Sequence, residues 1–367
     1  MILQIYYNFY MKILFLFLFC FIQLASFANA APQKRQSADI SKRKGPVIST
    51  ETVKLTTERP EYCLFGGQTG NAFYGQANYM MTIWKNRIIY LGESGGRQDY
   101  AAQRDTLKAM SMARGKKIVV AFGAMNKEIQ PMLDAYLAGE MNQEEFFTFL
   151  SGREDTNYDI EEYKPLLDFI TEKGLKAIAI GLPAALVDTI EEYGEEGLSQ
   201  EEKRLIPISS TDPRNGTYEK HIKKKLEETS GEKVSPEALK KHIHALAVLN
   251  ETMAKGLADF IQENPDYAAL AIVDNERIAY ASGITMAIKN YFSSDNTEEG
   301  TESENAASAV PAIPYTTIYI KHSKECPKRL PDSDKNLGGY VWYMDNSPIE
   351  NNNDAENIDS EKSKNAN

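Results

Sequence analysis

Short apolar runs alternate with amphipathic, helix-like stretches through the middle of the chain, and this alternation limits the fold more than any other feature. A run of four or five apolar residues is typical of a buried strand, whereas apolar residues spaced three or four apart indicate a helix that packs on one face. Such alternation predicts a mostly parallel central sheet with helices on both faces, which places the chain in the α/β class. The expected strands are residues 88–91, 118–122, 177–180, 270–273 and 316–320.

Capping residues mark the expected helix boundaries. Ser235-Pro236 is an N-cap followed by a proline that fits the first turn, and it begins a helix predicted to reach about residue 263. Asn142 with Glu145 three residues later fits a capping box, and Gly174 is expected to end an amphipathic helix over about 158–173. Because helical signals dominate residues 142–265, we expect a helical insertion there that forms an α-helical cap subdomain beside the sheet.

Both ends of the chain and one internal stretch are predicted to lie outside the folded domain. An apolar run follows Met11-Lys12, and Ala28-Asn29-Ala30 fits a cleavage site, so residues 1–30 are expected to be a secretory signal peptide whose true start is Met11. The signal predicts export to the periplasm or secretion. Composition predicts a flexible leader over 31–60, a disordered insertion over 293–309 and a disordered, acidic, asparagine-rich tail over 344–367. One α/β domain over 61–330 remains.

The mature chain has two cysteines, Cys63 and Cys326, and export would place them in an oxidising compartment. In an oxidising compartment they predict one disulfide, and two free thiols are the alternative. The net charge of −11 argues against nucleic acid as a partner. No apolar run in the mature chain approaches the roughly 20 residues of a membrane helix, so we expect no transmembrane segment there.

The histidines and cysteines form no recognisable catalytic or metal-binding pattern. The chain has four histidines, and His242 and His244 are two apart on a predicted helix, so they point to different faces and cannot chelate one metal. No H-x-x-x-H or C-x-x-C motif occurs, and the letters of G-x-S-x-G occur once, at residues 92–96. The glycine-rich stretch 63–81 lacks the spacing of a phosphate loop and predicts short strands with tight turns, as in a hairpin.

Six short motifs nevertheless follow one another in an order that is typical of a known family. They are Gly92-Glu93, Gln130-Pro131-x-Leu133-Asp134, Tyr163-Lys164-Pro165, Leu182-Pro183, Thr252-Met253-Ala254 and Gly283-Ile284. On these motifs the chain resembles the ChaN-like haem-binding uptake family of the Tiki (EreA/ChaN) superfamily over most of residues 85–290. The resemblance implies an exported haem-binding protein that is associated with iron uptake.

The chain departs from the family pattern at the positions that carry the superfamily's metal chemistry. The family's Gly-Glu-x-His signature has Gly95 in place of histidine, and Gly123 stands where the next strand normally carries glutamate. Arg277 replaces the second histidine, and Asn250 replaces an aspartate. Only Glu93 of the expected ligands remains, and a divalent ion needs three or more donors. The resemblance therefore predicts a degenerate Gly-x-x-His site and argues against a metal-dependent hydrolase.

Haem binding does not need that histidine pair, because iron can be held by tyrosinate, histidine or methionine, with cations for the propionates. The residues that the resemblance brings to the strand ends are Glu93, Arg97, Tyr100, Met253, Arg277 and Tyr280. The tyrosines and Met253 are candidate iron ligands, and the arginines are candidate propionate partners. The alternatives are structural: Tyr100 as a packed aromatic, Met253 as core filling, and Arg277 in a salt bridge with Glu93.

The expected ligand is haem or another tetrapyrrole or small apolar molecule, and a homodimer is among the expected assemblies. Two other functions remain open at this point. One is a non-catalytic interaction or scaffold protein of the same fold. The other is a metal-independent hydrolase that uses Glu93 as a general acid or base.

Overall fold

The computed structural model describes Pro60 and residues 62–94, 99–151, 163–207, 215–292 and 313–345. The predicted signal peptide, the leader up to residue 59, the insertion 293–309, the tail beyond residue 345 and Arg97 lie outside the described residues. What the sequence predicts for these segments and for Arg97 therefore stays a prediction.

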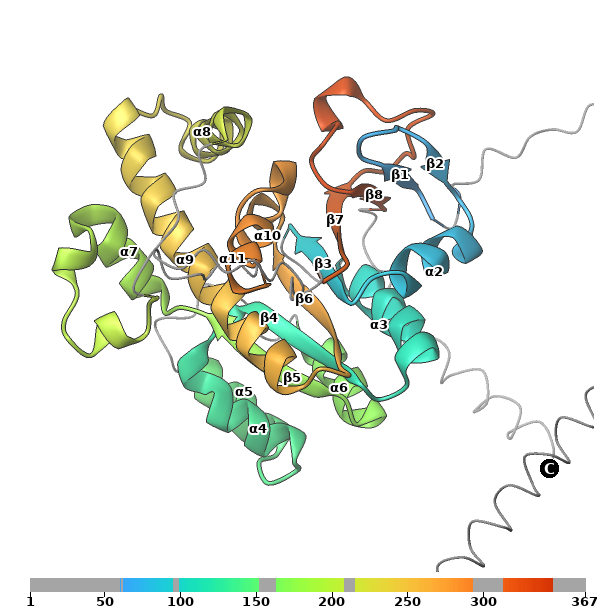
Figure 1. Cartoon of the computed structure of the whole chain (residues 1–367), viewed down its shortest axis with the longest axis horizontal. Helices are drawn as coiled ribbons and strands as arrows, with labels where there is room; N and C mark the ends of the chain where they lie inside the picture. Colours follow the sequence, from blue (N-terminus) through green and yellow to red (C-terminus); the bar gives the residue numbers. More distant parts are fainter. Residues whose placement is uncertain are drawn as a thin grey trace, which may run out of the picture. The chain divides into compact units, whose positions relative to one another are not determined.

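The described residues form one mixed sheet in the order β2-β1-β8-β7-β3-β6-β4-β5 (Figure 1). The pairs from β8 to β5 are parallel, and β1 pairs antiparallel with both β2 and β8. The predicted α/β class and the mostly parallel sheet are confirmed. The strands are β1 (Leu64–Gly66), β2 (Ala72–Phe73), β3 (Ile88–Glu93), β4 (Ile118–Asn126), β5 (Lys176–Gly181), β6 (Ala268–Asp274), β7 (Tyr315–His322) and β8 (Tyr340–Met344).

Alternate residues of the central strands pack into two separate cores, one on each face of the sheet. In β3, Ile89 and Leu91 belong to one core, and Ile88 and Tyr90 belong to the other. All four side chains are buried because β3 has a strand on each side and helices above and below. This double burial explains why the strands appear in the sequence as continuous apolar runs rather than alternating ones.

Helices cover both faces of the sheet. The first face packs against α2 (Gln76–Trp84), α3 (Tyr100–Arg114), α4 (Gln130–Leu137), α5 (Gln143–Ser151) and α6 (Lys164–Lys173). The second packs against α8 (Gly216–Ser230), α9 (Pro236–Glu263), α10 (Ile284–Ala287) and α11 (Lys289–Phe292), and α7 (Ala184–Tyr193) packs on α9. Short 3-10 turns are η3 (Lys127–Ile129), η5 (Glu195–Gly197), η6 (Glu202–Arg204), η7 (Asn275–Arg277), η8 (Ala279–Ala281) and η9 (Asp332–Asp334). Among these described helices, none combines the length and the apolar character needed to cross a membrane.

The predicted capping residues act as expected. Asn142 and Glu145 exchange side-chain bonds with each other's backbone N–H at 2.9 Å, which is the capping box read from the sequence. The Ser235 hydroxyl accepts from the Ala238 N–H, and Gly174 ends α6 in the left-handed conformation.

Three parts of the fold differ from the expectations. The stretch 63–81 forms a β1–β2 hairpin only in its first half, because residues from Gln76 onward begin α2. The sheet continues beyond residue 330, the expected end of the domain, since β8 pairs with both β1 and β7. The range 142–265 includes β5 and the long helix α9, which belong to the sheet and to the layer that covers it.

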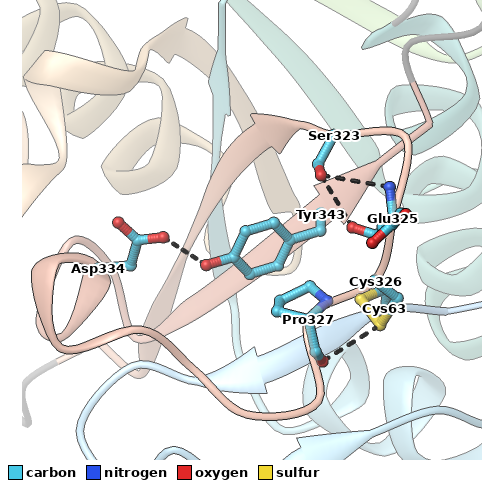
Figure 2. Close-up of a disulfide and its surroundings, with 7 residues drawn as sticks. All are labelled: Cys63, Ser323, Glu325, Cys326, Pro327, Asp334 and Tyr343. Carbon is cyan, nitrogen blue, oxygen red and sulfur yellow. Dashed lines mark hydrogen bonds between the residues drawn. A yellow bond between two sulfur atoms is a disulfide. The ribbon is translucent and has the colours of Figure 1, made fainter.

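The predicted disulfide joins Cys63 and Cys326, whose Cα atoms are 5.8 Å apart (Figure 2). It fastens the start of β1 to the loop after β7, across 263 residues of sequence. In the same region Tyr343 of β8 donates its hydroxyl to Asp334, which also accepts from Lys321 at 2.9 Å. The disulfide thus ties the N-terminal β1 to the C-terminal part of the domain, and the Tyr343–Asp334–Lys321 contacts stabilise that C-terminal part.

Candidate functional site

The carboxyl ends of β3, β6 and β7 lie side by side, and the side chain of Asn275 links them. Its amide donates to the Ile320 carbonyl at 2.9 Å and accepts from the Ile320 N–H at 3.0 Å, although β3 lies between β6 and β7. A Cβ placed on Gly92 would lie 2.1 Å from Asn275 Oδ1. The glycine of the Gly92-Glu93 motif therefore provides the space through which Asn275 crosses the middle strand. Ligands of open α/β sheets bind at such strand ends.

Glu93 ends β3 and is 7% exposed. The Tyr163 hydroxyl lies 2.8 and 2.7 Å from its two carboxylate oxygens, and the Tyr163 ring packs edge-on against Phe122. A buried carboxylate needs such donors, because its transfer out of water is costly. Tyr163 comes from the Tyr-Lys-Pro motif at the start of α6, so two of the sequence motifs meet in this contact.

Asp99 and His322 form a buried pair that sequence patterns did not reveal. Asp99, 1% exposed, accepts from His322 Nε2 at 2.8 Å through Oδ1 and from the Ser94 N–H at 2.9 Å through Oδ2. Because a carboxylate can only accept, His322 donates from Nε2, and its Nδ1 has no hydrogen-bond partner within the described part of the chain. A carboxylate-oriented imidazole of this kind can accept a proton or bind a metal.

A cleft of about 700 Å³ opens where α8 faces the ends of β6 and β7. Four lysines line it, three of them on α8, against three carboxylates. Lys224 and Lys225 lie 3.5 and 3.8 Å from Glu228, whereas Lys220 has no ion pair among the described residues. The cleft lining includes Lys220, His221, Lys224, Glu276, Tyr280 and His322.

Burial shifts the pKa of two groups in this cleft. Burial, followed by the charges of Lys225 and Lys224, lowers the pKa of His221 from 6.5 to about 4. Burial also raises the pKa of the Glu276 carboxyl, and the neighbouring Asp274 adds to the rise. At neutral pH the cleft therefore contains a neutral imidazole on α8, with its lone pair available.

Arg277, just below the cleft, lies in a largely buried polar group with Asn250 and Tyr218. Its Nε is 3.4 Å from Asp274 Oδ2, so the carboxylate that it contacts is Asp274, and no ion pair joins it to Glu93 within the described chain. Burial raises the pKa of the Tyr218 phenol, and the neighbouring Arg277 and Asn250 side chains oppose that rise. The alternative of an Arg277–Glu93 salt bridge is thus replaced by an Arg277–Asp274 pair within one turn.

The predicted haem residues divide between the two faces of the sheet. Glu93 and Tyr100 belong to the face covered by α3 and α6, and the Arg104 guanidinium lies 5.7 Å from the Tyr100 ring centre. Met253 and Tyr280 belong to the opposite face. Met253 is 2% exposed, and Tyr280 lines the cleft. The structure therefore brings together only part of the expected set.

Gly123, which stands where the family pattern has glutamate, is enclosed by its neighbours. A Cβ there would lie 2.9 Å from Val273 Cγ1, 3.1 Å from the Ile272 carbonyl oxygen and 3.3 Å from Met253 Cε. A longer side chain has no space unless Met253 and Val273 move. The apolar packing around Met253 thus occupies the place where the family pattern puts a carboxylate.

Sequence reasoning missed Asp99, His221 and His322. His322 follows the strand predicted over 316–320, so the sequence indicated its place at the carboxyl edge of the sheet. What could not be read was that β3 and β7 are neighbours, because strand order leaves no local trace in the sequence. His221 gave no signal, since α8 was not predicted as an element.

Comparison with known proteins agrees with this fold. A family model described as "Haem-binding uptake, Tiki superfamily, ChaN" matches residues 80–288, more than half of the chain. A solved structure of ChaN of Campylobacter jejuni with cofacially bound haem is similar, with a TM-score of 0.53, 13% identity, and coverage of 77% of this chain and 96% of that one. Protein RETICULATA-RELATED 5, chloroplastic, of Arabidopsis thaliana is 28% identical over 133 residues, or 34% of this chain. The match spans only 18% of that relative's length.

Proposed function

Because the chain belongs to the haem-binding uptake (ChaN) family of the Tiki superfamily, we propose that it binds haem or a related tetrapyrrole in the cleft beside α8. The observation that carries the proposal is the extent of the family match, since residues 80–288 include α8, the end of β6 and Tyr280. The proposed context is iron uptake outside the cytoplasm.

The cleft suits such a ligand in size and chemistry. Its volume of about 700 Å³ lies within the usual range of small-molecule pockets, roughly 300–1,000 Å³. Lys220 and Lys224 can pair with the two propionate carboxylates, and the Tyr280 and Tyr319 rings offer apolar surface. When bound, haem supplies a Lewis-acidic, redox-active iron; the chain's own residues bind it, orient it and limit its contact with water.

Their contacts favour some of the expected haem residues over others. Tyr280 lines the cleft, so its phenol can approach a bound ligand. Met253 is enclosed in the core against Gly123, and Arg277 is already paired with Asp274. We therefore assign propionate binding to the α8 lysines and retain Tyr280 as a contact of the macrocycle.

Export is the second part of the proposal. A disulfide that joins Cys63 and Cys326 is typical of proteins from oxidising compartments. With a signal peptide over 1–30, the exported protein begins at Ala31, and N-terminal sequencing of material recovered outside the cytoplasm tests this. A first residue before Met11 or a retained signal segment contradicts it.

Loss of the superfamily metal site is the third part. It is supported by the close packing around Gly123, which leaves no space for a carboxylate at that position. Metal analysis of the purified protein tests it, and a stoichiometric transition metal contradicts it.

Titration of the purified full chain with hemin, followed by Soret absorbance, tests haem binding. The expected result is a saturable shift, with an affinity that falls at least tenfold in the charge-reversed double variant Lys220→Glu/Lys224→Glu. A matched control is Lys85→Glu/Lys108→Glu, which makes the same charge change at exposed positions on the opposite face and should bind like the wild type. Absence of saturation, or equal weakening in the control, rejects the proposed site.

A further inference from the structure

His221 differs from the other histidines in its contacts. His242 and His322 each make a bond of 2.9 or 2.8 Å to a carboxylate, with Glu191 and Asp99 respectively, and His244 lies 3.7 Å from Glu195. The Nε2 atom of His221 is covered from solvent and has no hydrogen-bond partner within the described residues. A buried polar atom without a partner costs free energy, so it marks a position where a ligand atom can bind.

The protonation of His221 suits a metal bond. A ring nitrogen binds a metal only through its lone pair, so an imidazolium cannot coordinate. Burial and two neighbouring lysines keep His221 neutral over the whole range in which a solvent-exposed histidine titrates. The lysines that lower its basicity are also the cations that can neutralise carboxylates of the ligand.

The other candidate ligands in the cleft are less suitable. His322 Nε2 is bonded to Asp99, which leaves only Nδ1 for a metal. Nδ1 is next to the ring carbon that bears the chain, so a flat macrocycle bound there would collide with the backbone of His322. Tyr280 needs to lose a proton before it can bind iron strongly. In His221 the atom without a partner is Nε2, which is not bonded to the ring carbon that bears the chain, and the ring needs no deprotonation.

Tyr280 and His221 are in direct contact, with ring centres 5.3 Å apart in an edge-on arrangement. Tyr280 and Ala281 both adopt the left-handed backbone region, at φ 56° and 54°, which costs free energy for residues other than glycine. The Tyr280 backbone is bonded to Asn336 and Asn215, so access to the imidazole requires rotation of the Tyr280 side chain rather than movement of the turn.

We propose that His221 Nε2 would hold the iron if haem occupied the cleft, an assignment that rests on the haem binding proposed above. Lys220 and Lys224, one residue before and three after His221 on the same helix, bind the propionates. The imidazole donates its lone pair to iron, and no proton or electron is exchanged. Displacement of the Tyr280 ring opens the imidazole to the macrocycle.

Parallel titrations with hemin and with metal-free protoporphyrin separate the iron bond from macrocycle binding. In His221→Ala we expect hemin affinity to fall at least tenfold and the spectrum of a nitrogen-ligated haem to disappear, while protoporphyrin affinity stays within about threefold of the wild type. Added imidazole should restore the nitrogen-ligated spectrum. His242→Ala, which removes a histidine of the neighbouring helix, is the matched control and should leave both titrations unchanged.

The wild type gives a readout that does not depend on the folding of a variant. The ferrous hemin complex should show an iron–histidine stretching band in its resonance Raman spectrum. If that band is absent, or if Tyr280→Phe alters the iron spectrum while His221→Ala does not, the ligand assignment is overturned and haem binding stands. If the wild type binds neither hemin nor protoporphyrin, the proposed function itself fails, and the ligand assignment with it.

Discussion

The side-chain amide of Asn275 bonds to both backbone groups of Ile320 across a strand that lies between them. Asn275 follows β6, Ile320 lies in β7, and Gly92 of β3 supplies the passage. One side chain therefore sets the relative positions of three strand ends, including those that carry Glu93, Glu276 and His322. The geometry of the cleft depends on this contact.

Gly92→Ala should destabilise the protein by about 1–3 kcal/mol, because the added methyl group collides with Asn275 Oδ1. Urea denaturation measures the change. In an Asn275→Ala background, which itself leaves the Ile320 groups unpaired at a cost of about 1–3 kcal/mol, the same substitution should cost clearly less. Gly216→Ala is the control, since a Cβ there meets nothing within 4 Å. If the losses of stability of Gly92→Ala and Asn275→Ala simply add in the double variant, the Asn275 side chain does not pass Gly92 as described.

Removal of the disulfide should lower the free energy of unfolding by about 2–5 kcal/mol, because the bridge restricts a long segment of the unfolded chain. The double variant Cys63→Ser/Cys326→Ser, compared with the wild type in urea, gives the value. A reductant should destabilise the wild type to the level of the double variant and leave the variant unaffected. Equal sensitivity of both proteins to reductant means that the bridge is not the source of the effect.

The titration of His221 should appear near pH 4 in the ligand-free protein, well below the ordinary value of 6.5, because burial and Lys225 and Lys224 oppose its protonation. Between these pH values the unfolded chain binds a proton that the folded chain does not. The contribution of His221 to stability is therefore complete above pH 6.5 and is lost as the pH falls toward 4.

Histidine NMR resonances followed from pH 8 to pH 3.5 give the midpoint, and four histidines are few enough to assign by substitution. His221→Gln should flatten the loss of stability between pH 6.5 and 4 in urea denaturation. A His221 midpoint close to 6.5 shows that the ring is exposed and excludes the protected, neutral state on which its role as a ligand depends.

Sequence patterns predicted the elements of the fold where local chemistry decides them. The apolar runs that became β3, β4, β5, β6 and β7 and the caps at Asn142, Gly174 and Ser235 depend on residues within a few positions of each other. The short strand β8 and helix α2 were missed, because β8 has only five residues and α2 follows a glycine-rich segment. Their structure depends on tertiary neighbours: Trp342 of β8 packs against Tyr62 and Tyr79.

The family motifs predicted the carboxyl edge of the sheet but not how its residues are grouped. Glu93 meets Tyr163, and Tyr280 meets His221, on opposite faces. Successive residues at the end of a strand can turn to either face of the sheet. A motif therefore predicts that its residues lie at the carboxyl edge, but not on which face their side chains lie.

The sequence by itself determined the α/β class, the parallel sheet, the disulfide partners and the family, because hydrophobic period, capping chemistry and motif order are properties of neighbouring residues. Only the tertiary structure decided that Asp99 pairs with His322 and that His221 borders a lysine-lined cleft. Asp99 and His322 are 223 positions apart, and His221 comes from a helix that contacts α9, which follows it, and η8, which is distant in sequence. These contacts follow from strand order and helix packing, which depend on the whole domain rather than on any local stretch.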